Sequence, residues 1–227
     1  MWDSGWDDIF RKNEWGRYPP EEVVRVVARN FFGAPRRSDV AILEIGCGTG
    51  ANLWFVAREG FRASGIDGSQ VAIDRARQRM AEEHLTADLR VGDVATLPYA
   101  NAAFDAVLDV ECLYANSLKD SRGIVREVHR VLKPGGLFFS KTFMTGTYGD
   151  GKGTRLEGEP NTYVALDEGA LRKGYGLVRF SSEADVRALY EPLFDIETLD
   201  TLVRTEKNRA YEVREWLAVC RALPVPR

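Results

Sequence analysis

The most restrictive feature of this 227-residue chain is an apolar run, residues 40–45, that leads directly into three alternating glycines, Gly46, Gly48 and Gly50. A short apolar run bounded by turn residues is typical of a buried strand. Glycine lets the backbone turn sharply and lets a ligand approach closely, because it has no Cβ. Residues 52–59 have helical character, so the glycines are expected between a strand and a helix, where open α/β sheets bind nucleotide-like cofactors.

The rest of the chain alternates between strand-like and helix-like segments, which predicts an α/β fold. Strands are expected at about 40–45, 62–67, 89–91, 104–109 and 137–143, and helices at about 52–59, 69–83, 122–131 and 182–190. Pro19 and Pro20 indicate an earlier helix start, and Pro134-Gly135-Gly136 predicts a turn. Two final β-like runs, 195–204 and 211–223, predict an antiparallel hairpin. We therefore expect a Rossmann-like, doubly wound and mostly parallel seven-stranded sheet, with helices on both faces and the hairpin at its edge.

Acidic residues at strand ends narrow the kind of cofactor. The third glycine comes one residue too early for the G-x-G-x-x-G dinucleotide pattern. Asp67 ends the second strand, where a carboxylate accepts hydrogen bonds from ribose hydroxyls in dinucleotide folds. Asp93, followed by Val94, ends the third strand. Five ordered motifs result: Leu43–Gly50, Gly65–Asp67, Val91–Val94, Phe104–Asp109 and Arg130–Leu137.

These motifs, spread over about residues 40–143, resemble the class I S-adenosylmethionine-dependent methyltransferases. The resemblance implies a single domain over 1–227 that binds S-adenosyl-L-methionine and releases S-adenosyl-L-homocysteine. It implies in-line displacement, in which the sulfonium cofactor carries the reactivity. It also assigns Glu44 to ordering the loop near the methionine end, Asp67 to the ribose and Asp93 to the adenine. The implied cofactor-binding residues are Glu44, Gly46, Cys47, Gly48, Gly50, Asp67, Gly68, Asp93, Val94 and Asp109.

The catalytic residues are expected just after the fourth strand, which faces the acceptor in the resembled family. Asp109 and Glu111 would face one side if strand geometry continued through them. Either carboxylate would help an oxygen or nitrogen acceptor lose its proton, whereas a carboxylate or thiolate acceptor needs little or no base. A purely structural role for Glu111 is the alternative.

Two further segments are expected near the acceptor. The aromatic N-terminus, about residues 1–34, predicts a lid or a packing staple that includes Trp6, Trp15 and Tyr18. Residues 145–179 show little periodicity, and a long irregular loop in a compact domain is usually functional or partly disordered. Its Tyr148 and Arg155 would suit an anionic small molecule, although a solvated loop is equally compatible with the sequence. Tyr114, after the fourth strand, is also expected to contact the acceptor.

Composition limits the partners. The net charge of −3 gives no overall attraction to nucleic acid. No run approaches the roughly 20 apolar residues of a membrane span. The cysteines are scattered, and Ser140-Lys141-Thr142 in the fifth strand stands where catechol-type methyltransferases of the resembled family have a metal-binding Asp-Asn pair, so no metal is expected. We expect a cytoplasmic monomer or homodimer that methylates a small molecule at oxygen or nitrogen. The alternatives are a non-catalytic cofactor-binding subunit, a methyltransferase for protein or RNA, and a nicotinamide oxidoreductase.

Overall fold

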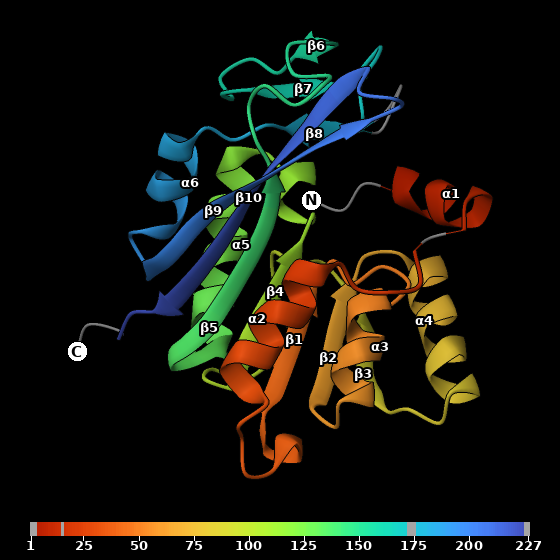
Figure 1. Cartoon of the computed structure of the whole chain (residues 1–227), viewed down its shortest axis with the longest axis vertical. Helices are drawn as coiled ribbons and strands as arrows, with labels where there is room; N and C mark the ends of the chain where they lie inside the picture. The colour runs from red at the N-terminus through yellow and green to blue at the C-terminus, as the bar shows by residue number, and fades with distance from the viewer. Residues whose placement is uncertain (1–3, 15, 172–175, 225–227) are drawn as a thin grey trace.

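The computed structural model describes residues 4–14, 16–171 and 176–224. Within these residues a seven-stranded sheet has the order β3-β2-β1-β4-β5-β10-β9. The five strands β1 to β5 pair in parallel, and β10 runs antiparallel to both of its neighbours. Figure 1 shows the helices on both faces of this sheet. The expected Rossmann-like fold class is therefore confirmed.

The first half of the chain supplies four of the five parallel strands and the helices that pack on one face of the sheet. Its strands are β1 (Ala41–Ile45), β2 (Arg62–Asp67), β3 (Ala87–Val91) and β4 (Phe104–Val110). Its helices are α1 (Gly5–Lys12), α2 (Glu21–Phe31), the 3-10 turn η1 (Arg37–Asp39), α3 (Ala51–Arg58) and α4 (Gln70–Glu82). Side chains of α2, α3 and α4 form one core with alternate residues of the sheet, such as Ile42, Ala106 and Leu108.

The second half covers the opposite face and completes the sheet. It comprises the 3-10 turn η2 (Leu113–Ala115), α5 (Leu118–Val131), β5 (Leu132–Phe143), α6 (Glu183–Tyr190), β9 (Phe194–Glu206) and β10 (Tyr211–Ala222). Side chains of α5 and α6 pack on the other alternate set, including Leu43, Ile45 and Val107. The period of two within each strand thus divides the apolar residues between two cores.

Local sequence signals account for most element boundaries. The Ser69 hydroxyl accepts a hydrogen bond from the Ala72 amide, so it caps α4 as expected. Ser182 and Asp185 form a capping box at the start of α6. Helix α2 begins directly after Pro20. The predicted C-terminal hairpin is also present, because β9 and β10 pair over most of their length.

Two segments differ from expectation. Pro134-Gly135-Gly136 does not end a segment but lies inside β5, where Phe104 pairs with Leu132 and Ala106 with Leu137. Residues 133–136 therefore bulge opposite Asp105. The region 145–179 is not irregular throughout, because it forms a small antiparallel sheet of β6 (Thr154–Arg155), β7 (Thr162–Val164) and β8 (Leu177–Arg179). These strands are two or three residues long, too short to produce a visible period of two.

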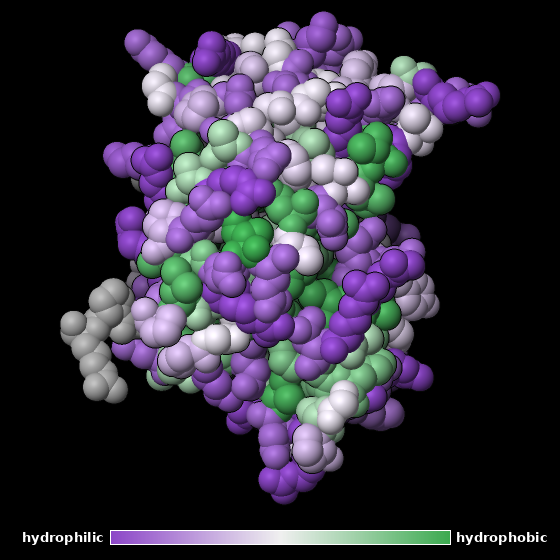
Figure 2. All heavy atoms as spheres, turned by 60° about the vertical axis from the view of Figure 1, so that its left-hand side comes forward, coloured by the Kyte–Doolittle hydropathy of each residue, from purple (hydrophilic) through white to green (hydrophobic). Residues whose placement is uncertain are grey.

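β9 is the edge strand of the sheet, and most of its exposed side chains are polar. Figure 2 shows this side of the molecule, where hydrophilic groups predominate and apolar groups appear between them. A hollow of about 520 Å³ lies there between α2 and the hairpin. Within the described residues, no helix is both long enough and apolar enough to cross a membrane.

Candidate functional site

The glycine loop connects β1 to α3 in the left-handed backbone region. The φ angles of Gly46, Gly48 and Gly50 are +63°, +51° and +79°. A Cβ on Gly46 would lie 2.6 Å from both Cβ and Sγ of Cys112. Gly50 is the N-cap of α3, and a Cβ there would lie 3.2 Å from the Ala76 side chain. The loop thus needs glycine both for its backbone angles and for close packing.

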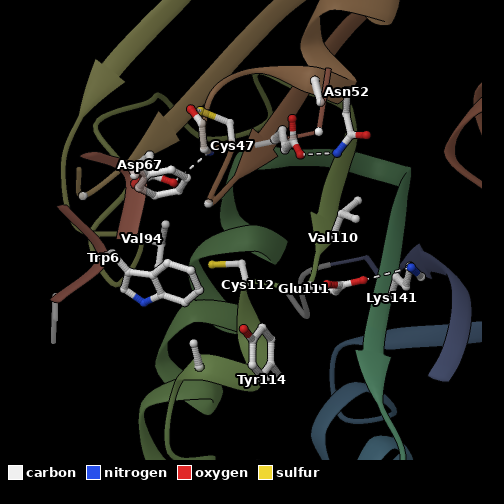
Figure 3. A pocket seen from close by; sticks show the side chains of 18 of the residues that line it. Trp6, Cys47, Asn52, Asp67, Val94, Val110, Glu111, Cys112, Tyr114 and Lys141 are labelled. Carbon is white, nitrogen blue, oxygen red and sulfur yellow. Dashed lines mark hydrogen bonds and ion pairs between the residues drawn. The ribbon is translucent and has the colours of Figure 1, made fainter. Parts of the chain in front are cut away.

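A cavity of about 390 Å³ opens beside this loop, at the carboxyl ends of the central strands (Figure 3). Its volume is within the usual range for small-molecule sites. One end is formed by the glycine loop and the ends of β2 and β3. The other end is formed by the segment after β4 and by β5. Its lining residues are Trp6, Phe10, Gly16, Tyr18, Pro19, Pro20, Glu44, Gly46, Cys47, Gly48, Ala51, Asn52, Asp67, Gly68, Gly92, Asp93, Val94, Val110, Glu111, Cys112, Tyr114, Ala115, Asn116 and Lys141.

Asp67 connects the glycine loop to the end of β2. Its Oδ2 accepts a hydrogen bond from the Gly48 amide at 2.8 Å, and its Oδ1 accepts one from the Ser69 amide at 2.8 Å. Burial raises the pKa of Asp67, although both amides favour the charged form. Each carboxylate oxygen retains a second lone pair. Asp67 can therefore hold the loop and accept further hydrogen bonds from a ligand in the cavity.

Glu44 and Asn52 form a buried polar pair in the cavity wall. The Asn52 amide donates to Glu44 Oε1 at 2.5 Å. Glu44 Oε2 and Asn52 Oδ1 are buried without a hydrogen-bond partner among the residues that the structure describes. Burial raises the pKa of Glu44 to about 8, opposed by the Asn52 hydrogen bond. A buried polar atom without a partner is costly, so this pair fits the charged amino-acid end of S-adenosylmethionine.

The segment after β4 separates the two expected catalytic carboxylates. Asp109 does not line the cavity. Its side chain is fully buried and is hydrogen-bonded to neighbouring parts of the chain. Its carboxylate accepts hydrogen bonds from the Ser140 hydroxyl at 2.6 Å and from the amides of Cys112 and Leu113. Burial raises its pKa to about 6. Strand geometry does not continue, since Glu111 has φ +60°, and the expectation that both side chains face one side is wrong.

Glu111 belongs to a charged cluster that the sequence did not reveal. Lys141 Nζ lies 2.9 Å from Glu111 Oε1 and 3.0 Å from Glu215 Oε1. Arg204 of β9 also pairs with Glu215, whose side chain is fully buried. Burial alone would lower the pKa of Lys141, but the two carboxylates raise it above its ordinary value. Lys141 is therefore a permanent cation at the end of the cavity away from the glycine loop.

Aromatic residues of the N-terminal segment cover the cavity. Trp6 and Phe10 of α1 line it with ring centroids 5.9 Å apart, and Tyr18 lines it while remaining 70% exposed. The Ser69 hydroxyl donates a hydrogen bond to Asp7, which fastens α1 to the start of α4. Trp15 lies outside the described residues. The arrangement suits the predicted lid, whose function stays a prediction.

Removing residues 1–18 tests this lid. We expect S-adenosylmethionine to bind about tenfold or more weakly, because burial of one large apolar side chain contributes about 1.5–3 kcal/mol. Isothermal titration of the truncated and full chains measures the difference. Unchanged affinity together with unchanged turnover would remove the lid role.

The structure does not bring all the expected site residues together. Gly68, Asp93 and Val94 line the cavity with Tyr114. Gly50 lies outside the lining and packs against α4. No described residue between 145 and 179 lines the cavity. Tyr148 instead stacks on Tyr211 with centroids 4.6 Å apart, and Arg155 lies exposed on the short strand β6.

Arg179, at the end of this insertion, nevertheless contacts residues next to the cavity lining. Its guanidinium donates to the carbonyls of Leu113 and Asn116 and to Ser121. These contacts fix the segment that carries Tyr114. This role of Arg179 was not predicted from the sequence, and neither were the lining residues Asn52 and Lys141. A single lysine in the apolar strand Leu137–Phe143 was the available signal for Lys141.

Comparison with known proteins agrees with this geometry. A family model described as a methyltransferase domain matches residues 42–136. The demethylmenaquinone methyltransferase of Tropheryma whipplei is 40% identical over 96 residues, covering 42% of this chain and 38% of that protein. The ubiquinone biosynthesis O-methyltransferase of Methylobacterium nodulans is 30% identical over 144 residues, covering 60% and 57%. The chain thus spans less than two thirds of the length of each relative.

A solved structure shows the same fold over most of the chain. The S-adenosylmethionine-dependent methyltransferase of Methanosarcina mazei superimposes with a TM-score of 0.68 at 22% identity, covering 82% of this chain and 93% of that one. Residues 42–136 thus match a methyltransferase domain in sequence, and the chain shares its fold with this solved methyltransferase.

Proposed function

We propose that this protein binds S-adenosylmethionine in the cavity and transfers its methyl group to a small-molecule acceptor. The observation that carries the proposal is that the glycine loop, Asp67 and the Glu44–Asn52 pair line the same cavity as the segment after β4. In that pair, Glu44 Oε2 and Asn52 Oδ1 have no hydrogen-bond partner among the described residues. Of the two relatives above, one is by its name a methyltransferase for demethylmenaquinone and the other an O-methyltransferase of ubiquinone biosynthesis. Small molecules are therefore the first acceptor class to test.

The chain would contribute binding, alignment and exclusion of water. Bound S-adenosylmethionine supplies an electrophilic methyl group on a sulfonium sulfur. Asp67 would accept hydrogen bonds from the ribose, and Asp93 with Val94 would contact the adenine. The Glu44–Asn52 pair would hold the methionine end. Trp6 and Phe10 would exclude water and keep an acceptor in line with the methyl–sulfur bond.

Asp67→Ala tests the cofactor site. We expect S-adenosylmethionine binding to weaken by about 1–3 kcal/mol, because ribose hydroxyls and the Gly48 amide lose their acceptor. Isothermal titration measures the dissociation constant, and Asp88→Ala, on the exposed edge strand β3, is the matched control. An unchanged constant in folded Asp67→Ala would refute the ribose role. Binding without S-adenosylhomocysteine production from any acceptor would instead favour the non-catalytic alternative.

A further inference from the structure

The acceptor end of the cavity has a chemical character of its own. Its lining after β4 and on β5 comprises Val110, Glu111, Cys112, Tyr114, Ala115, Asn116 and Lys141. Apolar and aromatic surfaces therefore surround one carboxylate and one ammonium. In Figure 3 the Glu111 carboxylate extends toward Lys141, on the side of the cavity away from Asp67. Glu111 directly follows β4, and Lys141 lies in the adjacent parallel strand β5, where it pairs with Val110.

Lys141 is held in place from the side opposite to the cavity. The buried Glu215 of β10 lies 3.0 Å from its ammonium and is itself paired with Arg204 of β9. Only 7% of the Lys141 side chain is exposed, compared with 34% for Glu111. An ammonium has three donors; that of Lys141 donates a hydrogen bond to Glu111 and pairs by charge with Glu215 Oε1, which has no hydrogen-bond partner among the described residues. A donor remains for an oxygen atom of a bound molecule.

The charges of this cluster discriminate between acceptor classes. Two cations and two carboxylates balance, so the acceptor end carries no excess positive charge for a permanently anionic acceptor. The same balance leaves no excess negative charge to attract a protonated amine. A neutral acidic hydroxyl suits both residues, because its proton goes to the carboxylate and its oxyanion then pairs with the ammonium.

We propose that Glu111 and Lys141 together recognise and activate an acidic hydroxyl group, a phenol or an enol, on a planar acceptor. This inference rests on the proposed methyl transfer and names its acceptor class. The hydroxyl proton moves to a Glu111 oxygen, and the acceptor oxygen forms its new bond to the methyl carbon. The electron pair of the broken carbon–sulfur bond stays on sulfur. Lys141 donates a hydrogen bond to the acceptor oxygen throughout, and Glu215 acts as a positioning residue for Lys141.

Three naphthalenes with the same ring system form the probe set: 2-naphthol, 2-naphthylamine and 2-naphthoate. We expect the wild-type protein to methylate 2-naphthol at least about tenfold faster than the other two, measured as S-adenosylhomocysteine release. Glu111→Gln should lower the rate with 2-naphthol by about a hundredfold or more, as loss of a general base does. The more acidic 6-cyano-2-naphthol should restore much of this loss, because it needs less help to ionise.

A test of Lys141 must also neutralise Glu215, because replacing Lys141 alone would remove an ion-pair partner of this buried carboxylate. The double variant Lys141→Met with Glu215→Gln removes one charge of each sign, and Glu215→Gln alone is its reference. We expect the double variant to lose about a hundredfold in rate with 2-naphthol relative to its reference, in the range found for oxyanion donors. Lys133→Met is the matched control, because Lys133 pairs with Asp105 near the start of β5, outside the cavity lining.

Binding gives a readout that does not depend on turnover. Titration of 2-naphthol into the protein loaded with S-adenosylhomocysteine should give about tenfold weaker binding in the double variant than in Glu215→Gln. The affinity for S-adenosylmethionine should stay within about twofold, since neither residue lies at the cofactor end. If the wild-type protein did not bind S-adenosylmethionine, the proposed function itself would be overturned. The inference alone is overturned if none of the three probes binds, if the amine or the acid is preferred, or if the double variant handles 2-naphthol as the wild type does.

Discussion

Replacing Gly46 with alanine is expected to destabilise the protein strongly and to abolish cofactor binding. A Cβ at Gly46 would lie 2.6 Å from the Cys112 side chain, a distance that requires the segment after β4 to move. The residue also has φ +63°, which costs a non-glycine residue roughly 1–2 kcal/mol. Overpacking adds about 1–3 kcal/mol, so we expect a loss of about 2–5 kcal/mol in the free energy of unfolding.

Gly60→Ala is the control that separates the cost of the close contact with Cys112 from the cost of the left-handed backbone angle. Gly60 has φ +84°, but a Cβ there would meet nothing within 4 Å. It should therefore show the left-handed cost alone, about 1–2 kcal/mol, and leave cofactor affinity unchanged. Urea denaturation measures stability and isothermal titration measures affinity. Equal losses for the two variants would show that close packing against Cys112 is unimportant.

Glu44→Gln is expected to change how stability depends on pH. Burial raises the pKa of Glu44 to about 8 in the folded protein, from an ordinary value of 4.5. Between these values the folded state holds a proton that the unfolded state has lost. The contribution of Glu44 is thus fully present below about pH 4.5 and is lost as the pH rises through about 8. Within this window the slope is about 1.4 kcal/mol per pH unit.

The glutamine variant cannot titrate, so this slope should disappear from its stability. Denaturation at roughly pH 5 and roughly pH 8 should show the wild type losing stability relative to Glu44→Gln as the pH rises. Glu82→Gln, on the exposed face of α4, is the matched control. A constant difference between wild type and Glu44→Gln over this range would contradict the raised pKa.

The same group should couple cofactor binding to proton release. If the cationic methionine end of S-adenosylmethionine lies beside Glu44, binding favours the carboxylate form and releases a proton near neutral pH. Calorimetry in two buffers of different ionisation enthalpy measures this release. Glu44→Gln should show none, whereas Asp67→Ala should retain it because Glu44 is intact.

The core of the fold was predictable because its signals are local. Five apolar strand segments, the Ser69 and Ser182 caps and the terminal hairpin all follow from neighbouring residues. The small sheet at 154–179 was missed, because strands of two or three residues show no period. The bulge at Pro134-Gly135-Gly136 was read as a turn, because local sequence does not say whether pairing resumes beyond it.

The residues at the glycine-loop end of the cavity could also be predicted from the sequence, whereas those at the end formed by Glu111 and Lys141 could not. Glycine spacing and an acid at a strand end are short-range patterns, and parallel strands bring their carboxyl ends to one edge. Asp109 and Glu111 looked equivalent until the left-handed backbone at Glu111 placed one in the interior and the other in the cavity.

By itself, the sequence determined that Gly46, Gly48 and Gly50 follow a buried strand and that Asp67 ends the next one. Those facts depend on backbone conformation and on periods within single segments. Only the tertiary structure decided that Lys141 meets Glu111 and Glu215, residues 30 and 74 positions away, one on either side along the chain. Strand pairing over such separations is set by how the whole sheet packs, so no local pattern encodes which charges will meet.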